Sequence, residues 1–145
     1  MSFQRKTRQV KDGHRTPDPD TSSYAWVVSR ESIWIFLTHA ALHGVPVMAA
    51  DVRNSYLQAP TSEKHFVICG PDFGIENIGK EAIINRALYG GKFSGRNFWH
   101  HLRSCMNFLG FEYSQDDLDV CMRESVLGRW WLGSHRCIII RIHNT

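Results

Sequence analysis

The sequence predicts an α+β fold, with a mixed or antiparallel sheet and helices packed on one face. Two segments, 30–43 and 94–109, carry apolar residues at the spacing of one helix face. Short apolar runs bounded by glycine, proline or polar clusters lie between these segments and predict strands. Three further short β segments close the chain, so the fold class is α+β with a final meander.

The elements can be placed along the chain in order. They are an extended arm over 1–23 with a short strand at 7–10, a helix over 30–43, a buried strand over 45–51, a short helical piece ending at Pro60, strands over 65–69 and 82–88 around a loop at 71–80, a helix from Ser94 to Leu109, and strands over 120–123, 129–132 and 136–142. We expect two parts, an arm over 1–23 and one domain over 24–145.

Local chemistry predicts where these elements begin and end. Pro17 and Pro19 exclude regular structure late in the arm. Ser29 and Ser94 are natural N-caps, and glycines stop both helices. Trp99 belongs to the apolar stripe of the second helix, and such a stripe is nearly always core. Glycines also bound the closing β segments, as expected for tight turns.

Length and composition fit one ordinary globular domain or a piece of a larger one. The 145 residues are 43% hydrophobic and 21% charged, which suffices for one core. The net charge of +3 is uneven, because five cations crowd the first fifteen residues: Arg5, Lys6, Arg8, Lys11 and Arg15. A basic arm of this kind suits a polyanion, although such runs are more often solvated surface.

The cysteines and the N-terminus indicate an intracellular protein. The four cysteines are far apart and form no CxxC pair, so neither a zinc knuckle nor a disulfide scaffold is expected. The N-terminus lacks the apolar core of a signal peptide, and no run of about 18 apolar residues occurs. We therefore expect free thiols, a reducing compartment and no contact with a membrane.

Asp51 is the residue most suggestive of chemistry. It ends a short apolar run, so a strand would deliver its carboxylate to a sheet edge. Magnesium prefers hard oxygen ligands and is usually bound by one or two carboxylates together with substrate phosphates. The alternative is a strand-terminal aspartate in a turn, which is the commoner use of this pattern.

Five motifs, taken in order, resemble the reverse transcriptase domain of copia-type retrotransposon polyproteins. They are Lys6 to His14, Tyr24 to Ser29, Ala50 to Pro60, Arg86 to Lys92, and Gly110-Phe111 with Asp117 to Val120. The resemblance covers the chain from Lys6 to Arg123. It implies the fingers and palm of a right-hand polymerase, cut from a Gag-Pol polyprotein, with a cytoplasmic virus-like particle or the nucleus as location.

The resemblance also implies roles for single residues. Asp51 is similar to the first catalytic carboxylate, which holds Mg²⁺ or Mn²⁺, and Val52 would offer its carbonyl. Tyr56 matches an aromatic steric gate that excludes the ribose 2′-hydroxyl. The remaining matches are Lys6 and Arg8 at the deoxynucleotide triphosphate, and Gly90, Gly91, Lys92 and Phe93 near the RNA or DNA template and primer.

The second acidic motif of the family, Tyr-x-Asp-Asp, has no intact counterpart here. Arg141, His143 and Asn144 stand where its tyrosine and two aspartates belong, which removes two negative charges. Two divalent ions need more than one carboxylate, and we do not expect the acidic turn at 116–119 to substitute. The predicted chain is thus a fingers-and-palm fragment without a thumb that cannot polymerise alone.

Two other interpretations remain open. One is a binding module without chemistry, in which the arm and a groove hold nucleic acid through its phosphates; the groove would use Lys80, Arg86, Lys92, Arg96 and Arg103. The other is a translated relic that neither folds stably nor binds. No histidine is expected to be catalytic, because those on the two helices have no cysteine or aspartate at metal-ligand spacing.

Overall fold

The computed structural model describes residues 10–16, 22–125, 128–133 and 138–142, with side chains as far as Glu124. The chain divides into two compact units. The first consists of residues 1–24 and 56–98, and the second of residues 25–55 and 99–145. This division differs from the expected boundary between residues 23 and 24, because the N-terminal segment belongs with residues 56–98.

The first unit is built around a two-stranded antiparallel ribbon, β2 (Phe66–Ile68) and β3 (Glu81–Ile83), in which Val67 pairs with Ala82. Backbone hydrogen bonds continue the pairing beyond the strands, as from Ala87 N to Ala59 O at 3.0 Å. The smaller elements are the 3₁₀ turns η1 (Gly13–Arg15), η2 (Pro71–Phe73) and η3 (Ile75–Asn77), and the helix α2 (Ser55–Gln58). The buried residues among those described in this unit are Gly13, Ala59, Cys69, Ala87, Ser94 and Phe98.

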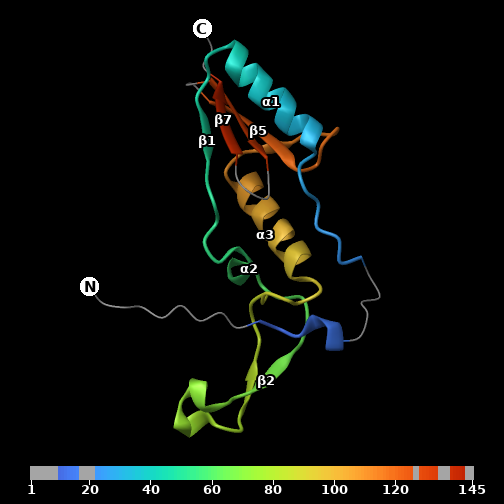
Figure 1. The fold of residues 1–145 in the computed structure, drawn as a ribbon, viewed down its shortest axis with the longest axis vertical. Helices are drawn as coiled ribbons and strands as arrows, with labels where there is room; N and C mark the ends of the chain where they lie inside the picture. Colours follow the sequence, from blue (N-terminus) through green and yellow to red (C-terminus); the bar gives the residue numbers. More distant parts are fainter. Residues whose placement is uncertain (1–9, 17–21, 126–127, 134–137, 143–145) are drawn as a thin grey trace, which may run out of the picture. The chain divides into compact units, whose positions relative to one another are not determined.

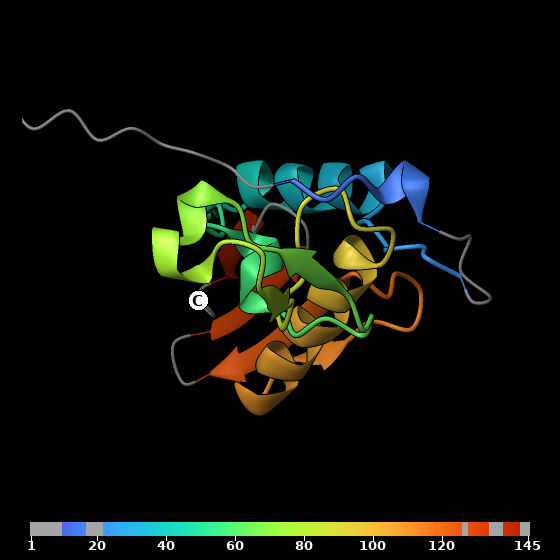
Figure 2. The same cartoon turned by 90° about the horizontal axis from the view of Figure 1, so that it is seen from below.

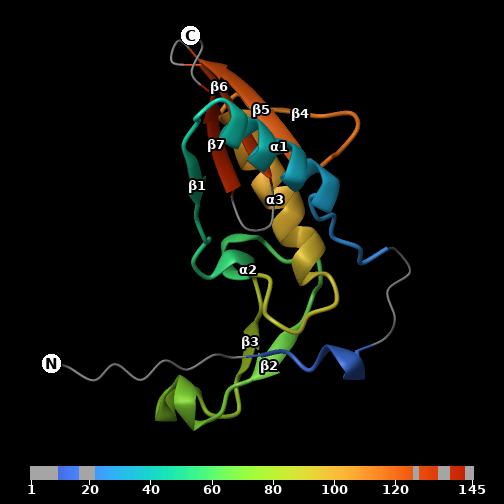
Figure 3. The same cartoon turned by 45° about the horizontal axis from the view of Figure 1, so that its top comes forward.

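The second unit contains a five-stranded sheet in the order β1-β7-β6-β5-β4. The strands are β1 (Val47–Ala49), β4 (Glu112–Tyr113), β5 (Val120–Ser125), β6 (Gly128–Gly133) and β7 (Ile138–Ile142). Every described pair of neighbours is antiparallel. Figures 1 and 3 show the helix α1 (Arg30–Leu42) beside this sheet, and in Figure 2 it forms a layer apart from the orange and red strands.

Two helices follow their predicted bounds closely. In α1 the Ser29 hydroxyl accepts a hydrogen bond from Ser32 N at 3.0 Å, as predicted for an N-cap, and Ala40 is buried. The helix α3 (Ser94–Phe108) contributes residues up to Phe98 to the first unit and the rest to the second. Ser94 does not cap this helix but is its first residue, and its hydroxyl donates to the Leu88 carbonyl.

Three strand predictions need correction. The strand predicted over 45–51 is only β1, and it is exposed rather than buried: Val47 is 42% and Met48 60% exposed. Among the described strands it is an edge strand, because its only partner there is β7. The strand predicted over 82–88 is shorter, and β4 was not predicted because its two residues carry no periodic signal.

The α+β class is confirmed, and the sheets are antiparallel rather than mixed in the part of the chain that is described. Among the same residues, no helix is long and apolar enough to cross a membrane.

Candidate functional site

Asp51 lies two residues beyond the end of β1, and its side chain is exposed. Ala49, the last residue of β1, pairs with Ile138, the first residue of β7. Ile138 pairs in turn with Gly133, the last residue of β6. Gly133 and Ile138, where β6 ends and β7 begins, therefore lie beside Ala49, from which the chain continues to Asp51.

Arg141 lies toward the opposite end of the same hairpin. It pairs with Trp130, three residues along β7 from Ile138. This distance is about 10 Å at the usual rise of a strand. The antiparallel register thus places Arg141 at the end of β7 away from the pairing with Ala49. His143 and Asn144 fall outside the described residues.

Asp117 has a structural role at the start of α1. Its Oδ2 accepts from Ser29 N at 3.0 Å and from Ser32 Oγ at 2.6 Å, and its Oδ1 accepts from Asp119 N at 3.1 Å. Burial raises the pKa of this carboxyl, but these hydrogen bonds outweigh the burial and hold the pKa below its ordinary value. Asp117 therefore joins the loop before β5 to the helix.

Asp119 is buried, with 1% of its surface exposed, and its Oδ1 accepts from Trp99 Nε1 at 2.5 Å. The sequence predicted Trp99 as core but carried no signal for this partner, twenty residues away. Neither Asp117 nor Asp119 is thus placed as a metal ligand. No three His, Cys, Asp or Glu side chains among the described residues gather closely enough to hold a metal ion.

Tyr56 is part of an aromatic cluster within the first unit. Its ring centroid lies 4.8 Å from that of Tyr89 and 6.1 Å from that of Phe98, and the rings are tilted. The Tyr56 side chain is half-buried, so packing fixes the ring. Val52 is 36% exposed and belongs to the second unit.

The N-terminal segment is fastened to the turn at residues 88–92, and this contact joins two of the predicted motifs. Lys11 N donates to Tyr89 O at 2.7 Å, and Lys92 Nζ donates to Thr16 O at 2.7 Å. Gly13 and Gly90 allow the close approach: a Cβ on Gly13 would lie 2.0 Å from Gly90 O, and Gly90 has φ +84°. Lys6 and Arg8 lie outside the described residues.

The residues predicted to lie near template and primer are in this turn or directly after it. Lys92 is half-buried and holds the N-terminal segment, so its side chain has a structural use in this unit. Phe93 is half-buried too, and its carbonyl accepts from Asn97 N at 2.8 Å at the start of α3. Gly91 N donates to Leu88 O at 3.1 Å and closes the turn.

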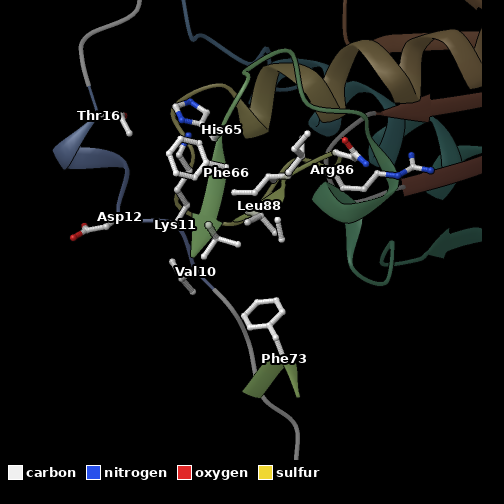
Figure 4. A pocket seen from close by; sticks show the side chains of 14 residues that line it. Val10, Lys11, Asp12, Thr16, His65, Phe66, Phe73, Arg86 and Leu88 are labelled. Carbon is white, nitrogen blue, oxygen red and sulfur yellow. The ribbon is translucent and has the colours of Figure 1, made fainter. Parts of the chain in front are cut away.

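A cavity of about 550 Å³ lies in the first unit and was not predicted. Its apolar lining includes Val10, Phe66, Val67, Phe73, Ile84 and Leu88. Figure 4 shows Phe66 and Leu88 near its middle and Asp12 turned away from them. Lys11 lies on the lining as well, but it is neutralised by Glu63. The cavity therefore combines a mostly apolar lining with the cationic side chain of Arg86.

Glu63 links the N-terminal segment to the ribbon. Its Oε2 accepts from Lys11 Nζ at 2.9 Å, and its Oε1 lies 3.3 Å from His65 Nε2. Burial raises the pKa of Glu63, but the hydrogen bond and charge of Lys11, with a smaller contribution from His65, hold the pKa below its ordinary value. Because Lys11 and Glu63 are 52 residues apart, no local pattern could have predicted the pair.

The cations proposed for a groove are bound to neighbouring polar atoms in the first unit. Arg86 Nη1 donates to Gln58 O at 2.9 Å, Arg96 Nη1 to Ser22 O at 2.7 Å, and Lys80 Nζ to Asn77 Oδ1 at 3.2 Å. In the second unit the Arg103 guanidinium stacks on the Tyr113 ring at 4.3 Å. These bonds position the side chains and do not exclude phosphate contacts, because a guanidinium has five donors.

Comparison with known proteins adds no relative: no protein-family model, no curated protein and no solved structure matches this chain.

Proposed function

We propose that the chain is the fingers-and-palm part of a copia-type reverse transcriptase domain that binds an RNA–DNA primer–template but does not add nucleotides. In this assignment the first unit corresponds to fingers and the second to palm. The proposal derives from the five ordered motifs and is supported by the strand pairing next to Asp51.

That strand pairing supports the assignment in one respect: Asp51 follows a strand that pairs with the β6–β7 hairpin, whereas the residues matched to the second motif begin at Arg141, at the other end of β7. The resemblance calls for a carboxylate at the end of one strand, next to a hairpin that carries two more acids. Here β1 ends two residues before Asp51, and the Gly133 and Ile138 end of the β6–β7 hairpin is paired beside it. The contact between the N-terminal segment and the turn at 88–92 also joins two motifs of the family in one unit.

The missing acids explain why we propose binding without nucleotide addition. Residues 125–145 contain no aspartate or glutamate, so no register of β7 can supply the second motif. Asp117 and Asp119 are engaged in structural hydrogen bonds. The described residues therefore do not fit a two-metal site, and Asp51 could hold only a single Mg²⁺ or Mn²⁺ together with substrate phosphates.

Primer extension on an RNA template tests this proposal. We expect no extension by the unmodified chain with magnesium or manganese. A chain with His135→Asp and Arg136→Asp, between β6 and β7 in the sequence, is expected to gain magnesium-dependent deoxynucleotide binding, the step that needs no thumb, and its primer extension is measured in parallel. The changes Arg141→Tyr, His143→Asp and Asn144→Asp provide the comparison, and the register predicts that they have less effect.

The control adds Asp51→Asn to the chain with His135→Asp and Arg136→Asp. Loss of the Asp51 carboxylate must abolish any primer extension that the two new acids provide. Extension by the unmodified chain would disprove the inactivity. If neither restored chain extends, and neither binds deoxynucleotides in a magnesium-dependent way, the assignment to a polymerase site at Asp51 is wrong.

A metal-independent nucleic-acid-binding module is the second candidate. It is favoured by the cations Arg86 and Arg96, whose guanidinium groups are positioned by carbonyl oxygens. Deoxynucleotide binding that needs magnesium and is lost in Asp51→Ala supports the first candidate. Duplex binding that is unchanged by EDTA and by Asp51→Ala, with no nucleotide binding, supports the second.

A further inference from the structure

Cys105 and His101 form an exposed pair on α3. They are four residues apart, which places them on neighbouring turns of one helix face, and Cys105 Sγ lies 3.8 Å from His101 Nε2. Cys105 is exposed, whereas Cys69 and Cys121 are 6% and 0% exposed. Among the described cysteines, Cys105 is thus the one that combines access to solvent with a basic neighbour.

Tyr113 on β4 lies near the pair. Burial raises the pKa of Tyr113, the charges of Cys121 and Cys105 add to this rise, and the charge of Arg103 opposes it. The Arg103 guanidinium lies over the rings of Tyr113, at 4.3 Å, and Trp99, at 5.1 Å. Thiolates form most readily beside basic groups, and His101 is the basic group next to Cys105.

We propose that Cys105 is a site of reversible thiol modification and that His101 serves it as a proton acceptor. The co-reactant is a low-molecular-weight disulfide. With Nδ1 of His101 protonated, Nε2 takes the proton from the Cys105 thiol. The thiolate attacks one sulfur of the disulfide, the old S–S bond breaks, and the leaving thiolate takes up a proton. Cys105 ends as a mixed disulfide, which any thiol can reduce.

Reaction rates of individual cysteines test this inference. The full chain is treated with oxidised glutathione or 5,5′-dithiobis(2-nitrobenzoic acid) at pH 7, and modified cysteines are identified by peptide mass mapping. We expect Cys105 to react at least ~10-fold faster than Cys69 and Cys121, and His101→Gln to slow it by about the same factor. Cys137→Ser in every chain keeps the readout to the three described cysteines.

Three further chains make the result decisive. His100→Gln is the matched control, because the His100 ring packs edge-on against that of Trp99 and five residues separate it from Cys105, outside the spacing of side-chain pairs on a helix. In this variant Cys105 should react at the rate of the unmodified chain. His101→Ala also removes the proton acceptor, so it should be as slow as His101→Gln. In Cys105→Ser the fast reaction with the disulfide should disappear, and only the slow reactions of Cys69 and Cys121 should remain.

The rates of Cys69 and Cys121 report on folding in each variant, because both are buried and become reactive only when the chain opens. The proposal is overturned if Cys105 reacts no faster than these two in the folded chain. An unchanged rate in His101→Gln or in His101→Ala would overturn the role of His101 as proton acceptor.

Discussion

At the scale of single residues, the hydrogen bond between Trp99 and Asp119 joins α3 to the loop before β5 within the second unit. A buried carboxylate is costly to leave without its donor, whereas the ring of Trp99 alone could be replaced by another aromatic residue. The acidic stretch at 116–119 is therefore structural in at least two of its members, because Asp117 and Asp119 hold a helix and a tryptophan.

We expect Trp99→Phe to lower the free energy of unfolding by about 2 kcal/mol, since it removes one hydrogen-bond donor to a buried carboxyl group. Urea denaturation measures the change. The matched control is Trp34→Phe, at a site 63% exposed on α1, where we expect a change within about 0.5 kcal/mol. Equal losses in the two variants would show that the hydrogen bond adds nothing to stability.

The ion pair of Glu63 predicts how the stability of the fold depends on pH. Its pKa is lowered in the folded state relative to its ordinary value of 4.5, so the ion pair stabilises the fold above that value. This stability is lost as the pH falls through the lower folded pKa. At pH 7 we expect Glu63→Gln to cost about 1 kcal/mol, and we expect the difference from the unmodified chain to vanish in strong acid.

Denaturation at a series of pH values measures this, with Glu81→Gln as the control. Glu81 is exposed on β3 in the same unit, and it should show little cost at any pH. A cost for Glu63→Gln that stays constant down to pH 2 would contradict the ion-pair explanation.

At the scale of elements, α1 depends on a residue far away in the chain. The Ser29 cap was predictable from its neighbours, but Asp117, 88 residues from Ser29, completes it by accepting from Ser29 N and Ser32 Oγ. The carboxylate also lies at the N-terminus of the helix, where the helix dipole favours negative charge.

We expect Asp117→Ala to lower the free energy of unfolding by about 2 kcal/mol, because two hydrogen bonds to a charged group are lost. The adjacent and exposed Asp116 offers the control, and Asp116→Ala should change stability by less than about 0.5 kcal/mol. A double-mutant cycle with Ser32→Ala isolates the pair. A coupling energy near zero would refute the role assigned to Asp117.

At the scale of the whole molecule, charge should govern association with nucleic acid. If the chain binds a primer–template duplex, Lys6 and Arg8 contribute through phosphates, and binding weakens as salt displaces this electrostatic gain. We expect Lys6→Ala with Arg8→Ala to reduce the slope of log K against log salt concentration by about 1 to 2.

Fluorescence anisotropy across a salt series measures that slope. Arg30→Ala with Lys64→Ala removes the same charge from exposed positions outside the matched motifs. If this pair reduces the slope as much as the arm variants do, binding follows net charge alone and the arm has no special role.

Local patterns were sufficient for much of the fold. Capping and helical spacing predicted α1 within a residue, from Arg30 to Leu42, and the closing apolar segments predicted β5, β6 and β7. The absence of Asp and Glu side chains after Glu124 is also a property of the sequence alone, and it leaves β7 without an acid in any register. These features depend on residues close together in the chain, which a sequence pattern can report.

The tertiary structure decided the features that depend on distant partners. Pairing of Ala49 with Ile138 made β1 an exposed edge strand among the described strands and placed Arg141 at the other end of β7. The ion pair of Lys11 with Glu63 moved the N-terminal segment into the first unit, and Trp99 acquired a buried acid. Register and long-range pairing are chosen by summed packing and hydrogen bonding over the whole chain, so no window of neighbouring residues specifies them.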